Sequence, residues 1–205
     1  DMPVQYEGIL AEHAQTRKQA VVFDTSHMGE FILQGNYADS GLDRLVSMTI
    51  KDMPIKTCRY GFLLNEQGGV IDDLIVFRQE KEKWFIVVNA STIEKDAAQF
   101  QKYLTAQARF QNISSLTGKI DFQGPQSREI LTSLIADIKK LDYYTFDFFH
   151  LLGHNVLISR TGYTGELGYE IYYPAQEIGN VWDVLLKKNE VKPAGLGARD
   201  VLRLE

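Results

Sequence analysis

The chain has 205 residues, of which 44% are hydrophobic and 24% charged, with a formal net charge of −5. This composition is typical of a globular protein, and the length suits one large domain or two small ones. The basic residues are spread along the chain, which argues against binding to nucleic acid or to an anionic membrane. The one cysteine, Cys58, excludes an internal disulfide and a cysteine-based zinc site, and it suits a reducing compartment. No apolar run reaches membrane-spanning length.

Apolar residues recur at helical spacing in four stretches of the chain. Ser91 and Glu94 form a capping-box pattern before the second stretch, and Pro125 suits the first turn of the third. The predicted helices cover residues 38–46, 92–107, 125–135 and 178–187. A further helical pattern over 199–205 has no stop signal, so we expect the chain to be a fragment of a longer protein.

Ten runs rich in β-branched and aromatic residues predict strands. Residues 65–69, with two glycines, predict a hairpin loop and therefore an antiparallel pair. The strands do not alternate one-for-one with helices, so a doubly wound parallel sheet is unfavoured and we predict an α+β fold with mostly antiparallel sheets, flanking helices and two subdomains. The predicted strands are 21–24, 31–34, 60–65, 71–78, 84–89, 110–114, 119–123, 144–150, 156–159 and 169–173.

Residues 162–171, G-Y-T-G-E-L-G-Y-E-I, hold three glycines in a turn that leads into a short strand. Glu170 lies inside that strand. Because a buried carboxylate is costly without donors, Glu170 is a candidate for ligand binding.

Asp72 and Asp73 follow a glycine turn and enter an apolar strand. Adjacent strand residues face opposite sides, so one aspartate can face a cleft while the other faces away. From spacing alone, the favoured interpretation is that both bind backbone N–H groups at the end of a hairpin.

Three other candidates have ordinary explanations on spacing alone. Asn89 suits a loop or helix cap, Tyr60 a half-buried aromatic, and Met28 a filler of the core. His27 has no carboxylate or cysteine at metal-ligand spacing, so we expect no metal site.

Arg199 follows the small residues Gly195, Gly197 and Ala198, which permit close approach of another backbone or of a flat ligand. Its guanidinium could pair with a carboxylate or stack on a ring, and a structural salt bridge is an equal alternative.

Several segments in order resemble the folate-binding aminomethyltransferase family, the T-protein of the glycine cleavage system. They are F-D-T-S-H-M-G at 23–29, the hairpin at 68–76, F-Q-G-P at 122–125, G-Y-T-G-E at 162–166 and A-R-D-V-L-R-L-E at 198–205. The resemblance runs from residue 3 to residue 205. Leu167 stands where the family often has Asp, and Gly197 where it often has Ala.

The resemblance implies a three-domain cloverleaf of which this chain covers two subdomains, without the C-terminal barrel. The expected first subdomain is discontinuous and folate-binding, with residues 1–50 and 117–175, and the second combines 51–116 with 176–205. Tetrahydrofolate is expected as co-substrate, with no metal. Carried over residue by residue, the family pattern makes Asp73 catalytic, facing the folate channel while Asp72 faces away, and makes Met28, Tyr60, Asn89, Tyr163, Glu170 and Arg199 folate contacts.

The implied reaction moves an aminomethyl-derived carbon from the lipoylated H-protein to tetrahydrofolate and releases ammonia. The expected location is the cytoplasm, or the mitochondrial matrix in a eukaryote. A folate-dependent demethylase of a small methylated amine or sulfonium stays an alternative, as does a non-enzymatic tetrahydrofolate-binding protein. The K-G-C-Y-x-G-Q pattern of one such non-enzymatic class is absent from the sequence.

Overall fold

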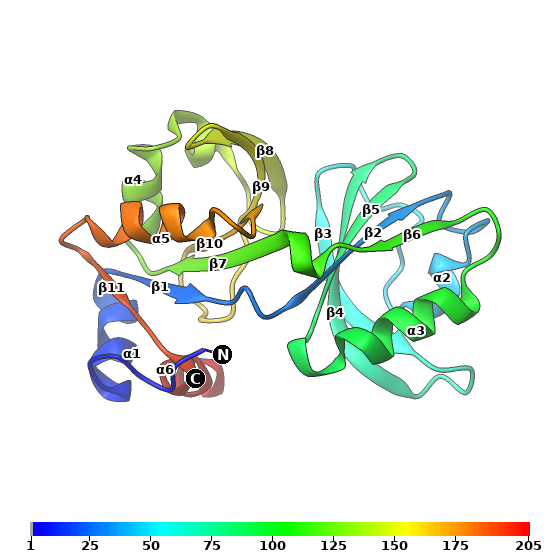
Figure 1. The fold of residues 1–205 in the computed structure, drawn as a ribbon, viewed down its shortest axis with the longest axis horizontal. Helices are drawn as coiled ribbons and strands as arrows, with labels where there is room; N and C mark the ends of the chain where they lie inside the picture. The colour runs from blue at the N-terminus through cyan, green and yellow to red at the C-terminus, as the bar shows by residue number, and fades with distance from the viewer. Residues whose placement is uncertain (1) are drawn as a thin grey trace. The chain divides into compact units, whose positions relative to one another are not determined.

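A computed structural model describes residues 2–205 and holds two sheets, each in its own unit. Unit 1 contains residues 2–27 and Leu116–Glu205, and unit 2 contains Met28–Ser115. Figure 1 follows the chain through both units.

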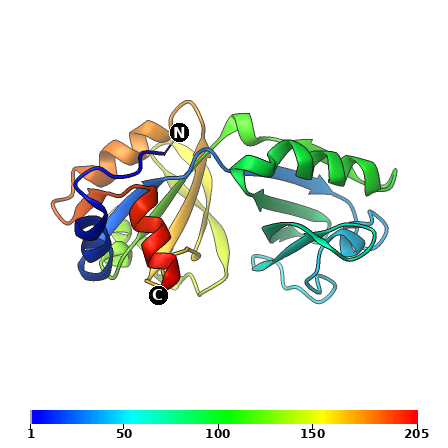
Figure 2. The same cartoon turned by 90° about the horizontal axis from the view of Figure 1, so that it is seen from below.

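Unit 2 is a five-stranded antiparallel sheet in the order β3-β4-β5-β2-β6. Leucines, valines and aromatics of alternate strand positions pack against helix α3, which covers one face of this sheet (Figure 2). Trp84, Phe31 and Phe100 are fully buried in this core. The elements are β2 (Gly29–Gln34), α2 (Leu42–Leu45), β3 (Cys58–Leu64), β4 (Val70–Glu80), β5 (Lys83–Val88), η1 (Ala90–Thr92), α3 (Ile93–Tyr103) and β6 (Arg109–Asn112).

Unit 1 is a six-stranded sheet in the order β11-β1-β7-β10-β9-β8. Only its β1–β11 pair is parallel. Helices α4 and α5 contribute to a core on one face, and α6 packs against Val21 and Phe23 on the other. The elements are α1 (Ile9–Lys18), β1 (Ala20–Asp24), β7 (Thr117–Gln123), α4 (Ser127–Thr132), η3 (Ala136–Lys140), β8 (Phe146–Leu151), β9 (His154–Ser159), β10 (Gly168–Pro174), α5 (Ile178–Leu186), β11 (Val191–Pro193) and α6 (Leu196–Leu204). The short η2 (Ser114–Leu116) contains the last residues of unit 2 and the first of this segment of unit 1.

The predicted α+β class is confirmed, and each of the ten predicted strands overlaps an observed one. The hairpin loop is also present, because Asn65 and Gly69 are joined by a backbone hydrogen bond and Gly68 has a φ of 78°. The capping box at Ser91 is wrong. Residues 90–92 form a 3₁₀ turn, α3 starts only at Ile93, and no side chain caps it.

The units divide the chain at other places than the sequence predicted. Residues 28–50 lie in unit 2, because β2 pairs with β5 and β6, and residues 176–205 lie in unit 1, because β11 pairs with β1 and α5 packs against β7. Unit 1 is therefore discontinuous and unit 2 continuous. Strand partners are chosen by tertiary contacts that a local pattern does not encode.

Within residues 2–205, none of the helices has both the length and the apolar character that crossing a membrane requires.

Gly124 is required where β7 leaves the sheet. Its φ is 124°, and a methyl group there would lie 2.3 Å from the carbonyl oxygen of Gln19. We expect Gly124→Ala to lower the free energy of unfolding by roughly 1–3 kcal/mol, through strain plus collision with backbone. Gly153→Ala is the control, because Gly153 also has a positive φ but no atom within 4 Å of the added methyl group. Urea unfolding should rank Gly124→Ala as the more damaging change, and equal losses would contradict the role of the collision.

Candidate functional site

In unit 2, Asp72 and Asp73 converge on one amide. The Nδ2 of Asn89 donates to the Oδ1 of Asp73 at 2.8 Å and to the Oδ1 of Asp72 at 2.9 Å. The Oδ2 of Asp72 also accepts from the Oγ1 of Thr92 at 2.6 Å. We call these four residues the Asn89 network. The side chains of both aspartates thus bind other side chains, whereas the sequence interpretation expected them to bind only backbone N–H groups at the end of the hairpin.

Strand alternation separates the two aspartates. Asp72 lies two residues before Leu74, which packs in the core under α3, so Asp72 is on the helix-covered face. Asp73 is on the opposite face, paired across strands with Phe62. Asn89 reaches both because it follows the last residue of β5 and precedes α3.

The face that carries Asp73 also carries exposed aromatic rings. Tyr60 pairs with Ile75, two positions along from the Phe62–Asp73 pair, and is 48% exposed. Tyr60 and Phe62 meet edge to face with ring centroids 5.7 Å apart. Met28 immediately precedes Gly29, which pairs with Val88, so Met28 and Asn89 flank the same strand pair. The four unit 2 candidates therefore belong to one end of this sheet.

In unit 1, β7 carries a buried row of polar residues. Lys119, Asp121 and Gln123 alternate with Ile120 and Phe122, which lie in the core. The Nζ of Lys119 bonds the Oδ1 of Asp121 and, at 2.6 Å, the Oε1 of Glu170 on the neighbouring β10. Arg199 of α6 pairs with the Oδ2 of Asp121. We call Lys119, Asp121, Glu170 and Arg199 the β7 charge network.

Mutual pairing favours the charged forms of Lys119, Asp121 and Arg199 despite their burial. Burial by itself would raise the pKa of Asp121, but Lys119 and Arg199 outweigh it and hold that pKa well below its usual range. Burial by itself would lower the pKa of Lys119, and Asp121 and Glu170 raise it instead. Two carboxylates thus balance two cations.

Glu170 is 5% exposed, and both of its carboxylate oxygens have partners. Oε1 accepts from Lys119, and Oε2 accepts from the hydroxyl of Thr161, which Ser159 contacts in turn at 2.6 Å. The prediction that a strand carboxylate here needs donors is therefore confirmed, and the donors present are protein groups.

Arg199 forms both a salt bridge and a contact with an aromatic ring, the two interactions considered for its guanidinium group. Its guanidinium pairs with Asp121 and lies 4.5 Å from the centroid of the Tyr163 ring. Tyr163 is 40% exposed, so Arg199 lies against one part of the ring while other parts of the ring are open to solvent. The close backbone approach expected at Gly195 is also present, because a methyl group there would lie 2.5 Å from the carbonyl oxygen of Val4.

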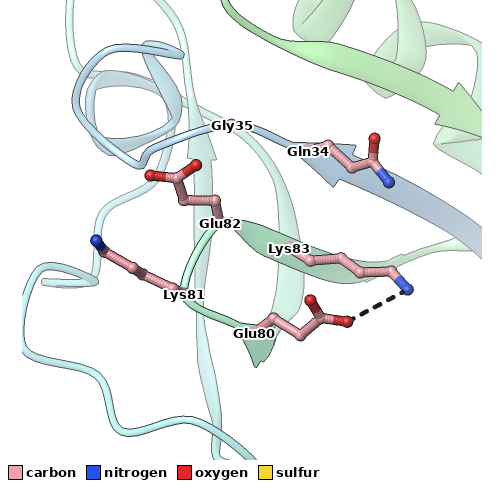
Figure 3. A pocket seen from close by; sticks show the side chains of 6 residues that line it. All are labelled: Gln34, Gly35, Glu80, Lys81, Glu82 and Lys83. Atoms are coloured by element: carbon pink, nitrogen blue, oxygen red, sulfur yellow. Dashed lines mark ion pairs between the residues drawn. The ribbon is translucent and has the colours of Figure 1, made fainter.

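Two surface hollows lie elsewhere in the units. The larger, of about 440 Å³, is formed by Gln34, Gly35 and the charged turn 80–83 of the β4–β5 hairpin, where Lys83 pairs with Glu80 (Figure 3). It holds none of the candidate residues, and its lysines and glutamates have the character of a solvated turn. The smaller, of about 220 Å³, is lined by Tyr143 and by residues 160–162 and 165–168 of the glycine-rich loop, including Thr161.

Among residues 2–205 no group of three or more histidine, cysteine, aspartate or glutamate side chains is arranged to hold a metal ion.

Sequence reasoning missed Lys119, Asp121 and Thr161. The available signal was the polar–apolar alternation K-I-D-F-Q at 119–123, which by itself indicates a strand with one solvated face. Burial of that face depends on neighbouring strands and on α6.

Lys119 has a matched test. Lys119→Met removes a fully buried cation and leaves Asp121 and Glu170 facing each other, so we expect the free energy of unfolding to fall by about 3–5 kcal/mol. Lys140→Met is the control, because Lys140 and its partner Asp137 have side chains 72% and 70% exposed. Urea unfolding of the control should match the unchanged protein, and a similar small loss in both variants would contradict the importance of the network.

Known proteins are similar to this chain in sequence and in fold. The GCVT N-terminal domain family matches residues 1–205. A protein of Exiguobacterium sibiricum named aminomethyltransferase is 41% identical over 206 residues, covering 100% of this chain and 57% of that protein. Another of that name, from Pseudothermotoga lettingae, is 42% identical over 212 residues and is covered to 58%. The chain thus spans a little over half the length of these relatives.

Solved structures agree. The glycine cleavage system aminomethyltransferase T from Bartonella henselae superimposes with a TM-score of 0.90 at 32% identity, covering 99% of this chain and 55% of that one. A chain of a heterotetrameric sarcosine oxidase from Corynebacterium sp. U-96 shares the fold, with a TM-score of 0.61 at 11% identity. On the family match and these identities, the chain belongs to the GCVT N-terminal domain family.

Proposed function

We propose that the protein containing this chain is a tetrahydrofolate-dependent aminomethyltransferase of the glycine cleavage system. It takes the aminomethyl group from the lipoylated H-protein, and it acts in the cytoplasm, or in the mitochondrial matrix of a eukaryote. The proposal rests on the position of Asp73 in a chain of this family. The Asn89 amide holds the Asp73 carboxylate on the sheet face that α3 does not cover.

The reaction balances without a metal or an oxidant. The aminomethyl carbon loses two bonds, one to the lipoyl sulfur, which leaves as a thiol, and one to the amine nitrogen, which leaves as ammonia. Two folate nitrogens form bonds to that carbon and lose their protons, one to the sulfur and one to the departing ammonia. The products are dihydrolipoyl protein, ammonia and 5,10-methylenetetrahydrofolate.

Asp73 is proposed as the catalytic carboxylate. As a folate nitrogen attacks carbon it gains positive charge, and a fixed carboxylate stabilises that charge or accepts the proton. The Asn89 amide donates to Asp73 at 2.8 Å, which holds the carboxylate in one orientation before the substrate arrives. Tyr60 and Met28 supply apolar surface beside it.

The unit 1 candidates are proposed to bind the flat pterin. Tyr163 offers a ring face backed by Arg199. Glu170 is proposed to accept from the amino group and the ring N–H of the pterin edge. Lys119 already bonds Oε1 of Glu170, while Thr161 and, at 3.4 Å, the hydroxyl of Tyr172 bond Oε2. The pterin would therefore use the remaining lone pair of Oε1 and replace the long contact from Tyr172.

Asp73→Asn tests the catalytic role. The substitution keeps the size of the side chain and removes its charge, so we expect turnover of the full-length protein to fall by roughly 10²–10⁴-fold. Tetrahydrofolate affinity should change much less, since Glu170 and the ring contacts stay. The assay is formation of 5,10-methylenetetrahydrofolate from aminomethylated H-protein.

The matched control is Glu66→Gln, a carboxylate-to-amide change at an exposed position of the adjacent hairpin loop. It should keep full turnover. An Asp73→Asn variant as active as this control would remove Asp73 from the mechanism. Transfer from a methylated amine or sulfonium instead of H-protein would favour the demethylase, and tight folate binding without any transfer would favour a binding protein.

Glu170→Gln tests the pterin contact. The change replaces an acceptor by a donor that faces donors, so tetrahydrofolate affinity should fall by about tenfold or more. Calorimetry on the full-length protein measures it, with thermal unfolding to verify that the variant is folded. Glu166→Gln in the neighbouring loop is the control and should bind normally. Unchanged affinity in Glu170→Gln would exclude this residue from the binding site.

A further inference from the structure

A third carboxyl group, Asp96, lies behind the Asn89 network. It is in the first turn of α3 and is fully buried, with 0% exposure. Asp96 is one helical turn beyond Thr92, whose hydroxyl bonds Asp72, so the carboxyl group of Asp96 lies beside that of Asp72. Two carboxyl groups from different elements, β4 and α3, therefore meet on the covered face of the sheet.

Two buried carboxylates in contact repel each other, and neither has a hydrogen to donate. As a carboxylate, Asp96 has no hydrogen-bond donor on either of its two oxygens. One proton removes both problems, because a protonated Asp96 becomes a donor aimed at Asp72. Two carboxyl groups in this arrangement are expected to hold one proton between them.

The surroundings decide which member carries the proton. Burial, followed by the contact with Asp72, raises the pKa of Asp96 to about 7, with Thr92 and the cation of Lys95 opposing. Burial would also raise the pKa of Asp72, but the donors Thr92 and Asn89 outweigh it, and that pKa is lowered. Asp72 from β4 and Lys95 from α3 itself are the charged groups that act on Asp96.

The ionised partner is the one that holds Asn89. Asp72 accepts from the Nδ2 of Asn89 at 2.9 Å and from its backbone N–H at 3.3 Å. The same Nδ2 has a second hydrogen, and this one reaches Asp73 at 2.8 Å. An amide held on one side by Asp72 therefore presents a fixed donor to Asp73 on the other.

We propose that Asp72 and Asp96 share one proton and act as positioning residues that fix the Asn89 side-chain amide on Asp73. The proton makes Asp96 a donor to Asp72, and Asp72 stays a carboxylate that orients Asn89. Loss of the proton places two negative charges side by side under α3 and loosens this orientation. The effect on turnover rests on the proposed function, whereas the shared proton and the hold on Asn89 do not.

The experiment compares Asp96→Asn and Asp96→Ala in the full-length protein. Asparagine supplies a permanent neutral donor to Asp72, as the protonated acid does, and alanine supplies none. Glu94→Gln is the matched control, because Glu94 is an exposed carboxylate in the same helical turn. The readouts are unfolding equilibria from pH 5 to pH 8, and NMR titration of the Asp96 carboxyl carbon and of the Asn89 side-chain amide.

The sign of the stability change follows from the raised pKa of Asp96. An acid whose pKa is higher in the folded state stabilises the fold most below its unfolded pKa, and that stabilisation is lost as pH rises toward the folded value near 7. The unfolding constant of the unchanged protein should therefore rise between pH 5 and pH 8, relative to that of Asp96→Asn, by roughly tenfold or more. Glu94→Gln should keep the same pH dependence as the unchanged protein.

Positioning is tested by Asn89 itself. In the unchanged protein its side-chain amide signals should shift with the same midpoint as the Asp96 carboxyl carbon. In Asp96→Asn they should stay constant with pH, and in Asp96→Ala they should broaden or exchange faster at every pH. Rescue by asparagine but not by alanine supports positioning, since a merely structural role would not move the Asn89 signals.

Two results would overturn the proposal. One is an Asp96 carboxyl that titrates near 4, and the other is an Asn89 amide indifferent to both variants. If these NMR results hold but the protein transfers no aminomethyl group, the proposed function fails and the proton pair stands. If transfer occurs, turnover of the unchanged protein should decline above the Asp96 midpoint, and this decline should be absent in Asp96→Asn.

Discussion

In both sheets successive residues of a strand point to opposite faces, and this period of two decides which side chains can meet. On β7 it buries Ile120 and Phe122 in the core and puts Lys119 and Asp121 on the other face, beside Glu170 of β10. On β4 it separates Asp72 from Asp73. A shift of one residue in either register would exchange core and polar positions, so both networks depend on the pairing of their strands.

The two networks solve the cost of burying charge in different ways. In unit 1 two cations balance two carboxylates, and each member has a partner within a salt-bridge distance. Such a cluster contributes little net stability, but removal of one member leaves an uncompensated buried charge and is therefore strongly destabilising. In unit 2 the carboxylates of the Asn89 network have neutral donors, an amide and a hydroxyl, and these donors lower the pKa of Asp72 despite its burial.

Local patterns predicted the strands well, because β-branched and aromatic runs between glycine and asparagine turns carry a strong signal. They missed α1, whose buried positions include the polar Glu12 and Thr16 instead of an apolar stripe. Glu12 is buried because it accepts from the backbone of residues 6–8 and of Gly195, a contact between segments far apart in the chain. They also missed β11, which has only three residues and ends in proline.

The candidate site shows the same division between local and long-range information. Alternation alone predicted that Asp72 and Asp73 face opposite sides, and the need of a buried carboxylate for donors predicted partners for Glu170. The identities of those donors, Lys119 and Thr161, could not be predicted, because they come from β7 and from the loop after β9. Asn89 was interpreted as a cap, since its bonds to two aspartates require β4 and β5 to be aligned first.

The position of the proton proposed for Asp96 has a consequence for charge at Asp73. Asp72, Asp73 and Asp96 together would carry three negative charges, and with one proton they carry two. Because the proton is on the helix-covered face, it relieves repulsion inside the core without neutralising the carboxylate on the other face. In the proposed reaction, a nitrogen that becomes cationic beside Asp73 would therefore meet a carboxylate whose orientation is set by a neutral amide. The proposed proton and the proposed catalytic carboxylate thus lie on opposite faces of the same sheet.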